Sequence, residues 1–351
     1  MAQSPQVGDD QPLRLAVVGA THGHFPWVLE RIGKSDIELV GIFEPDQILM
    51  KGYIEKYQLK KKIWYEDLDW MLDELKPEAV VVFGSIFDHL AAVEACAPRG
   101  IHVMVEKPLA TNLEHAEQMV QLAHKHQILL LTNYETSWYP TTEKTYQLVN
   151  EGFVGKIRKA IFYTGHEGPQ EIGVGKAFLD WLTDPVQNGG GALIDFGCYG
   201  ANIMTYLMNE QQPVSVWAST RQYKPHIYPN VDDDALIIVN YPDAQCIIQA
   251  SWNWPFGRKD MEVYGESGFI KTQDHAVMQI KNKTSDEVLT LHAKADDLGV
   301  YGDPFSYFAD VVRGRLQVSK NSLYDLDNNL MVVRILDAAR RSAQSGEVIY
   351  F

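Results

Sequence analysis

The sequence predicts an α/β protein whose amino-terminal part is a doubly wound parallel sheet. Short apolar runs alternate there with helix-like segments, at the spacing that βαβ units require. Turn residues follow the apolar runs, as at Gly19 and Pro45. The length of 351 residues exceeds what one hydrophobic core usually supports, so a second domain is expected.

The strands expected in the first part are short and mostly apolar. Pro26 is tolerated early in the first helix, because the first turn leaves its N–H groups unbonded. The predicted strands cover residues 13–18, 37–43, 79–83, 101–105 and 128–131, and the predicted helices cover residues 25–32, 64–75, 89–97 and 113–126.

The second part also contains many short strand-like runs, which Gly, Pro, Asn and Asp separate. These runs cover residues 156–163, 214–221, 235–241, 244–251, 260–265, 268–273 and 277–281, and helices are expected at 142–150, 199–208, 304–313 and 324–342. We place the domain boundary near residue 137. Residues 1–137 then form the first domain, with residues 1–11 as a flexible tail, and residues 138–351 form the second.

Composition excludes several classes of partner. The net charge of −15 and the pI near 5.1 disfavour nucleic acid and anionic membrane surfaces. The 3 cysteines are too few and too scattered for a disulfide framework. No stretch approaches the ~20 apolar residues of a membrane span. A cytoplasmic protein is expected; the alternative is a periplasmic protein whose leader was removed before Ala2.

A turn after the first predicted strand is a candidate nucleotide-binding site. It departs from G-x-G-x-x-G, because Thr21 and His24 replace the second and third glycines. Backbone N–H groups at the start of the following helix could bind a pyrophosphate. The expected cofactor contacts in this turn are Gly19, Ala20, Thr21, His22, Gly23 and His24.

Glu44 ends the second predicted strand, where an acidic residue binds the ribose hydroxyl groups of NAD. Its carboxylate would repel the 2′-phosphate of NADP, so NAD is favoured. The alternative is that Glu44 only starts a turn before Pro45. His22 and His24 alternate as metal ligands sometimes do, but no acidic residue or cysteine is close in sequence, so no metal site is predicted.

Lys107 ends another buried strand, at the sheet edge where open α/β folds bind their ligands. The surrounding residues are Val105-Glu106-Lys107-Pro108-Leu109-Ala110, and a second motif further on is Gly189-Gly190-Gly191-Ala192-Leu193-Ile194-Asp195-Phe196-Gly197-Cys198-Tyr199. The two motifs, in this order, resemble the signatures of the Gfo/Idh/MocA family, which includes glucose-fructose oxidoreductase and inositol dehydrogenase. The resemblance covers nearly the whole chain.

This resemblance implies a fold and a set of cofactor contacts. The family has an NAD(P)-binding Rossmann domain and a carboxyl-terminal α/β domain with a large open, mostly antiparallel sheet. It often forms homodimers or homotetramers through that sheet. Beyond the turn and Glu44, the implied cofactor contacts are Ser85, His89, Glu106 and Lys107.

The second motif implies the catalytic groups. Asp195, Tyr199 and Asn202 are spaced to share one helical face. Many relatives have histidine at the place of Tyr199, and the tyrosine version resembles enzymes in which a tyrosine is the acid/base group. A phenol titrates near ~10, and a neighbouring ammonium such as Lys107 can lower that value. The alternatives are a core tyrosine bonded to Asp195, and an Asp195 that orients substrate or anchors Lys107.

Polar and aromatic residues beside these motifs are candidate sugar contacts, since carbohydrate pockets combine hydrogen-bonding groups with aromatic faces. The expected substrate-binding residues are Asn133, Trp138, Tyr139, His166, Glu167, Trp181 and Asn202. Three consecutive acids, residues 232–234, are expected to form a solvated loop.

Three functions are consistent with these features. The first is an NAD(P)-dependent oxidoreductase acting on a hydroxyl of a sugar, glycoside or cyclic polyol, with Lys107, Tyr199 and Asp195 as catalytic residues. The second is an NAD-retaining glycoside hydrolase of the same fold, which cleaves by transient oxidation. The third is a non-catalytic nucleotide-binding protein.

Overall fold

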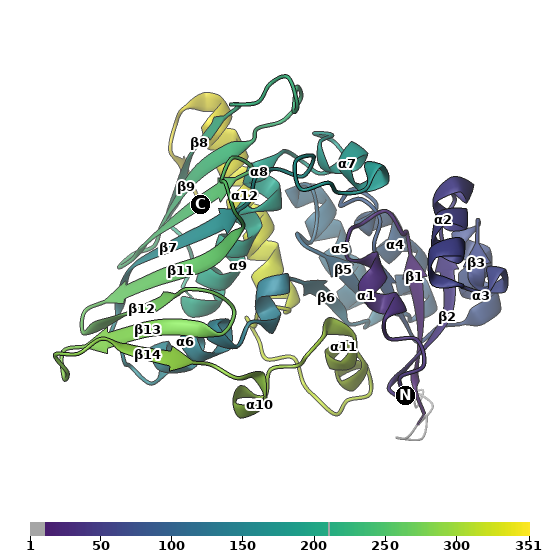
Figure 1. The fold of residues 1–351 in the computed structure, drawn as a ribbon, viewed down its shortest axis with the longest axis horizontal. Helices are drawn as coiled ribbons and strands as arrows, with labels where there is room; N and C mark the ends of the chain where they lie inside the picture. Colours follow the sequence, from purple (N-terminus) through teal and green to yellow (C-terminus); the bar gives the residue numbers. More distant parts are fainter. Residues whose placement is uncertain (1–10, 210) are drawn as a thin grey trace.

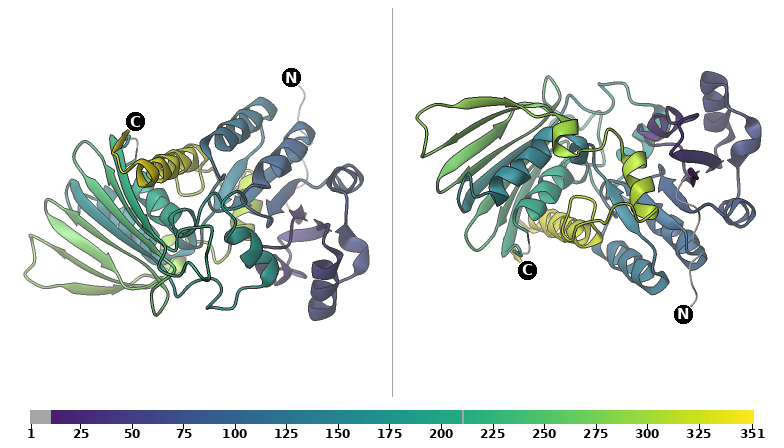
Figure 2. Two further views of the ribbon diagram at one scale, coloured as in Figure 1. Left: turned by 90° about the horizontal axis from the view of Figure 1, so that it is seen from above. Right: turned by 90° about the horizontal axis from the view of Figure 1, so that it is seen from below.

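The computed structural model describes residues 11–209 and 211–351 (Figure 1). Nearly all of the tail expected at residues 1–11 lies outside the described residues. Two sheets face each other across a layer of helices (Figures 1 and 2). Among the described residues, no helix is both long enough and apolar enough to cross a membrane.

The first sheet has six parallel strands in the order β3-β2-β1-β4-β5-β6, which confirms the doubly wound fold. Its order reverses between β1 and β4, and ligands of such sheets bind at this reversal. The strands are β1 (Leu13–Val18), β2 (Ile37–Phe43), β3 (Trp64–Tyr65), β4 (Ala79–Val82), β5 (His102–Glu106) and β6 (Leu130–Asn133).

Helices flank this sheet. The first ends at Leu29 and not at residue 32 as predicted, and two others also differ from the prediction. The helix expected at residues 64–75 was wrong at its start, because Trp64 and Tyr65 pair with β2 as an edge strand. The Asp67 carboxylate then caps a helix that begins at Leu68. Helix α2 was not predicted. The helices are α1 (Phe25–Leu29), α2 (Gln47–Tyr57), α3 (Leu68–Leu75), α4 (His89–Cys96) and α5 (Leu113–His126).

The second sheet has nine strands in the order β14-β13-β12-β11-β7-β10-β9-β8-β15. All its pairs are antiparallel except β7 with β10, which confirms the mostly antiparallel sheet. The strands are β7 (Ile157–Gly165), β8 (Ser215–Arg221), β9 (Asp234–Asn240), β10 (Gln245–Ser251), β11 (Arg258–Gly265), β12 (Gly268–Thr272), β13 (Val277–Asn282), β14 (Leu289–His292) and β15 (Ile349–Tyr350).

Helices cover the face of the second sheet that is turned toward the first (Figure 2). Helix α9 packs on β7 and β10, and α12 packs on β8, on α9 and on α5 of the first domain. Helix α12 therefore joins the two domains. The helices of this part are α6 (Pro140–Asn150), α7 (Lys176–Leu182), α8 (Ala192–Asp195), α9 (Gly197–Leu207), α10 (Ala295–Leu298), α11 (Pro304–Val312) and α12 (Leu326–Ser345).

Three hydrophobic clusters form the core. One lies between the second sheet and its helices, and the other two occupy the two faces of the first sheet. Phe305 and Phe308 of α11 belong to a cluster of the first sheet. The chain therefore returns to the first domain after building the second sheet, because the apolar side of α11 covers a face that the early helices leave open.

Candidate functional site

The turn after β1 packs tightly against the turn after β4. Gly19 has a φ of +76°, and a Cβ there would lie 2.6 Å from the backbone N of Gly84. The His22 N–H donates to the Phe83 carbonyl at 2.9 Å. Only glycine fits at position 19, where both the backbone conformation and the close approach exclude a side chain.

Glu44 lies at the end of β2, beside this turn, as predicted. Its two carboxylate oxygens accept hydrogen bonds from the N–H groups of Ala20, at 2.8 Å, and Asp46, at 2.9 Å. Burial raises the pKa of this carboxyl, although both hydrogen bonds oppose that shift. Glu44 therefore stabilises both the turn at Asp46 and the turn after β1, as in the second alternative considered above, and its contact with a ribose stays a prediction.

The histidines of the turn have an acidic partner that their sequence neighbourhood does not contain. Glu106, at the end of β5, lies 3.2 Å from Nδ1 of His24. One ligand atom of each of His22, His24 and Glu106 lies within 4.8 Å of the others, a group that could hold a metal ion. The Nδ1 of His22 also accepts a hydrogen bond from the backbone N–H of His24 at 3.0 Å.

Glu106 is buried in this cluster. Burial alone would raise the pKa of its carboxyl, but His24, His22 and a hydrogen bond from Asn133 outweigh it and lower that pKa to about 2. Asn133 donates to Oε1 at 2.8 Å, while Oε2 has no hydrogen-bond partner within the described structure. A buried carboxylate oxygen of this kind is a place where a ligand donor fits.

Two tryptophans predicted as sugar contacts have other partners. Trp181 of α7 donates to the Thr21 hydroxyl at 3.1 Å and stacks on His22, so it covers the nucleotide-binding turn. Trp138 donates to the Asn133 side chain at 2.9 Å and stacks on Tyr324. Neither tryptophan lines the cavity of about 760 Å³ described below, and their role as sugar contacts stays a prediction.

Two further predicted cofactor contacts lie at the start of α4. The Ser85 hydroxyl lies 2.7 Å from both the Asp88 carboxylate and the Gln187 side-chain amide, so its single hydrogen can bond either one, and the contact with Gln187 links the first domain to the loop before α8. His89 is fully buried beside the Leu109 carbonyl. Burial lowers the pKa of His89 to about 4, so this imidazole is neutral at physiological pH.

Lys107 and Asp195 form a buried ion pair between the domains. The Lys107 ammonium donates to the Asp195 carboxylate Oδ1 and, at 3.0 Å, to the Asp195 carbonyl. Oδ2 accepts a hydrogen bond from the indole of Trp252 at 3.0 Å. Burial alone would lower the pKa of Lys107, but Asp195 outweighs it and raises that pKa. Asp195 thus anchors Lys107, and both its oxygens are engaged.

The glycine run before Asp195 lets the domains approach closely. Gly189 has a φ of +84°, and a Cβ there would lie 2.7 Å from the Thr111 carbonyl of the first domain. The Asp232 carboxylate accepts from the N–H groups of Gly191, at 3.0 Å, and Leu193, at 2.7 Å. The solvated loop predicted at residues 232–234 was therefore wrong, because buried N–H groups need these carboxylates as acceptors.

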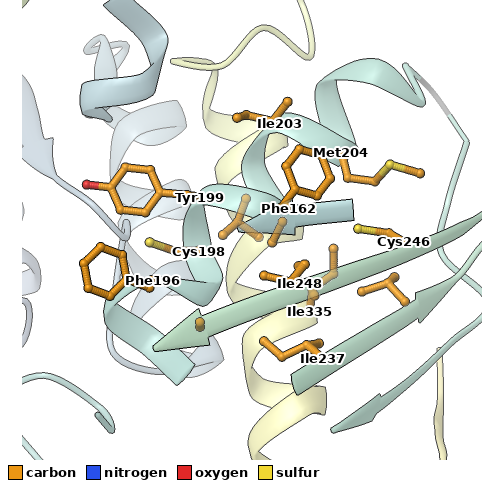
Figure 3. Close-up of a cluster of buried hydrophobic side chains, with 14 of the residues drawn as sticks. Phe162, Phe196, Cys198, Tyr199, Ile203, Met204, Ile237, Cys246, Ile248 and Ile335 are labelled. Carbon is orange, nitrogen blue, oxygen red and sulfur yellow. The ribbon is translucent and has the colours of Figure 1, made fainter. Parts of the chain in front are cut away.

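Tyr199 stands in the next helix, with its hydroxyl pointing away from the apolar cluster (Figure 3). Two ammonium groups flank its ring, with the Nζ of Lys107 at 5.2 Å from the centroid and that of Lys259 at 5.1 Å. Burial raises the pKa of the phenol well above its usual value, and Glu135 adds to this shift. The lowered pKa expected from Lys107 is therefore not found, because burial disfavours the phenolate and the carboxylates of Glu135 and Asp195 disfavour it further.

Asn202 does not share the surroundings of Tyr199. Helix α8 ends at Asp195 and α9 begins at Gly197, so the single helical face expected for these residues is interrupted. The Asn202 side chain donates to the Leu323 carbonyl at 2.9 Å and to the Asn329 side chain at 3.3 Å. These bonds hold α9 to α12, so Asn202 is a structural residue and not a substrate contact.

A cavity of about 760 Å³ is lined by Lys259, the second lysine beside the Tyr199 ring, although Tyr199 itself is not among its lining residues. His166 and Tyr139 line it, as predicted for substrate contacts, and the Nδ1 of His166 accepts from the Gly168 N–H at 2.9 Å. Glu167 is next to His166, and its carbonyl binds Lys224. The remaining lining residues are Glu135, Gly165, Phe256, Gly257, Arg258, Lys259, Asp260, Glu262, Lys271, Thr272, Gln273, Asp274, His275 and Gln279.

Sequence reasoning did not assign roles to three residues of this region. Glu135 lies between Asn133 and Trp138, which were predicted to bind substrate, but no role was predicted for Glu135 itself. Trp252 lies in the loop that follows β10, and Lys259 lies near the start of β11. No local sequence motif identifies either residue. Only their contacts with Asp195 and Tyr199 identify them.

A dinucleotide with a nicotinamide ring fits these residues. The turn after β1 leads into a helix, as in sites whose backbone N–H groups bind a pyrophosphate, Glu44 follows the adjacent strand, and the buried Oε2 of Glu106 has no hydrogen-bond partner among the described residues. The cavity lined by Lys259 leaves space for a second ligand.

Comparison with known proteins agrees with this arrangement. The trans-1,2-dihydrobenzene-1,2-diol dehydrogenase of Macaca fuscata fuscata is 25% identical over 225 residues, which cover 64% of this chain and 63% of that protein. The aldose-aldose oxidoreductase of Caulobacter crescentus, complexed with glycerol, has a TM-score of 0.79 at 20% identity, covering 97% of this chain and 100% of the other. The inositol dehydrogenase homolog of Azotobacter vinelandii, complexed with NAD+, has a TM-score of 0.82 at 18% identity, covering 98% and 100%.

Matches to protein families cover both domains. Residues 13–134 match the oxidoreductase family with an NAD-binding Rossmann fold, and residues 142–271 match the GFO/IDH/MocA C-terminal domain. Since the two matches include most of the sequence, the chain belongs to the GFO/IDH/MocA family of oxidoreductases, and its first domain is an NAD-binding Rossmann domain.

Proposed function

We propose that this oxidoreductase transfers a hydride between NAD and a carbon that bears a hydroxyl group, in a sugar, a glycoside or a cyclic polyol. The observation that carries the proposal is the buried Lys107–Asp195 pair beside Tyr199, immediately after β5 of the NAD-binding domain. The named relatives act on diols, aldoses or inositol, which supports this substrate class.

Tyr199 is the proposed acid/base group. Its raised pKa keeps the phenol protonated in the free enzyme, which is the form that donates a proton to a carbonyl oxygen. In the oxidative direction the phenolate accepts the proton of the substrate hydroxyl. The two ammonium groups beside the ring favour that phenolate, while Glu135 and Asp195 oppose it.

Lys107 is proposed to bind the reacting oxygen. An ammonium has three N–H donors, and Asp195 accepts two of them at its carboxylate and carbonyl. The third can donate to the substrate oxygen and stabilise the charge that develops there. The nicotinamide, when bound, accepts the hydride from the same carbon.

Glu44 supports NAD over NADP. Its buried carboxylate accepts from the turn after β1, and if the adenosine ribose is bound there, a 2′-phosphate would meet a negative charge. Binding of both cofactors can be compared by calorimetry without any substrate.

The test is a panel of sugars, glycosides and inositols with NAD, on the intact protein and on Tyr199→Phe. We expect kcat to fall by about 10²- to 10⁴-fold in the variant, the usual contribution of general acid–base catalysis. Calorimetric affinity for NAD should stay unchanged, since the ring remains. Full activity of Tyr199→Phe would refute the acid/base role. Release of an aglycone without accumulation of NADH would instead support the hydrolase alternative.

A further inference from the structure

The second ammonium beside Tyr199 belongs to an ion pair of its own. Lys259, near the start of β11, pairs with Oε2 of Glu135, which follows β6 in the first domain. The other oxygen of Glu135 accepts the hydroxyl of Tyr139. Three side chains from two segments, Glu135 and Tyr139 after β6 and Lys259 in β11, thus bond one another on the wall of the cavity.

The Lys259–Glu135 pair is partly exposed, whereas the Lys107–Asp195 pair is buried. The side chains of Lys259 and Glu135 are 21% and 30% exposed, whereas Lys107 and Asp195 are each 8% exposed. Both Lys259 and Glu135 line the cavity of about 760 Å³. A ligand that enters this cavity therefore meets the Lys259–Glu135 pair next to the Tyr199 ring.

The charges along the cavity indicate an uncharged ligand. Arg258 pairs with Asp260 at 2.7 Å, and Lys271 approaches Glu262 at 3.5 Å. With Lys259 held by Glu135, every Lys and Arg of the lining has a carboxylate partner, and Asp274 adds one more negative charge. A phosphate or carboxylate would have to displace one of these acidic residues.

Two adjacent hydroxyl groups suit this pair chemically. An ammonium only donates hydrogen bonds and a carboxylate only accepts them, whereas each hydroxyl can do both. One hydroxyl can accept from Lys259 while its neighbour donates to Glu135, and hydrogen bonds to charged groups are the stronger kind. The Lys259 Nζ lies 5.1 Å from the Tyr199 ring centroid, so hydroxyl groups bound by this pair would lie near the ring of the proposed acid/base residue.

We infer that Lys259 and Glu135 recognise two adjacent hydroxyl groups of an uncharged sugar or cyclic polyol, next to the carbon that is oxidised. This inference rests on the proposed function, because it takes Tyr199 as the reacting group. It adds a recognition pair and restricts the substrate to neutral compounds with neighbouring free hydroxyl groups.

The experiment measures KM and kcat with NAD for uncharged sugars and inositols, their monodeoxy analogues, glucuronate and glucose 6-phosphate. Lys259→Met, Glu135→Gln and the double variant are compared with the intact protein. The double variant has the same net charge as the intact protein and leaves neither charge without its partner. It therefore controls for misfolding caused by an unpaired charge in a single variant. Lys176→Met is the matched control, since it removes an exposed lysine that is paired with Asp180 on α7, outside the cavity lining.

We expect KM for the uncharged substrate to rise about 10- to 100-fold in Lys259→Met, as for a lost hydrogen bond to a charged group, with a smaller change in kcat. With the intact protein, one monodeoxy analogue should have a higher KM than the parent compound. With Lys259→Met, the analogue and the parent compound should have similar KM values, because the hydrogen bond that the analogue lacks is already absent. The inference is overturned if KM changes less than twofold in both single variants, or if an acidic or phosphorylated sugar is the better substrate. If turnover is absent with every compound, the proposed function fails and this inference fails with it.

Discussion

Two lysines lie at nearly the same distance from the Tyr199 ring, 5.2 Å for Lys107 and 5.1 Å for Lys259, yet their surroundings differ. Lys107 is buried and bound to Asp195, which Trp252 holds in turn. Lys259 faces the cavity and is bound to Glu135. One ammonium is fixed by the fold, and the other is accessible to a ligand.

This difference separates two roles that a single charge cannot combine. A buried ammonium keeps its position and its charge whatever enters the cavity, because moving it would leave a carboxylate unpaired in the interior. A cavity ammonium can exchange part of its hydrogen bonding with a ligand. We therefore expect changes around Lys107 to act on folding and kcat, and changes around Lys259 to act on KM.

Lys107→Met should have the largest effect. It leaves the Asp195 carboxylate buried without its cation, which costs about 3–5 kcal/mol in unfolding free energy. It should also reduce kcat by about 10²- to 10⁴-fold, since the reacting oxygen loses its cationic partner. Urea denaturation and steady-state kinetics measure the two effects.

The double variant Lys107→Met/Asp195→Asn is the control for this prediction. Removing both charges should recover much of the lost stability, because no unpaired ion remains. Activity should stay low. Recovery of activity together with stability would mean that Lys107 acts only through folding.

Low pH should destabilise the folded protein, because it protonates the buried Glu106 carboxylate. Its folded pKa of about 2 lies below the usual 4.5, so its contribution to stability is complete above pH 4.5 and is lost as the pH falls toward 2. The full loss is on the order of 3 kcal/mol by the linkage relation.

Glu106→Gln tests this by urea denaturation at pH 6 and pH 3. The variant should be less stable than the intact protein at pH 6, and the difference should shrink at pH 3. A constant difference at both pH values would show that the Glu106 charge does not contribute. The Lys259–Glu135 pair, which is partly exposed, should add little to this acid sensitivity.

Much of the fold follows from sequence patterns that are local. The parallel strands are continuous apolar runs, and alternation with helices sets their order of appearance. Helix α2 was missed because only Met50 is buried along it, so it has almost no apolar stripe to detect. The edge strand at Trp64 was taken as helix because its two residues pair with β2 only in the folded sheet.

The site was less predictable, because its contacts join distant segments. Lys107 and Tyr199 could be proposed from their motifs, but the offset of the Lys107 charge by Asp195 depends on a pairing between domains. His22, His24 and Glu106 meet only because β1 and β5 end at the same edge of the sheet. The break before Gly197 redirects Asn202 toward α12, and no spacing rule anticipates it.

Trp252→Phe should have the smallest of these effects and sharpens the comparison between the two lysines. Trp252 is fully buried, and its indole N–H is the donor to Oδ2 of Asp195 at 3.0 Å. Phenylalanine keeps an aromatic ring but leaves that oxygen without its donor, which should cost about 1–3 kcal/mol in unfolding free energy.

The kinetic signature of Trp252→Phe distinguishes positioning from simple loss of stability. A looser Asp195 lets Lys107 shift, so kcat should fall several-fold while KM for the sugar stays near its original value, the opposite of Lys259→Met. Trp70→Phe is the control, since Trp70 is 60% exposed and lies on α3. If Trp252→Phe raised KM and left kcat unchanged, Asp195 would take part in binding the substrate, and the separation between a fixed and an accessible lysine would not hold.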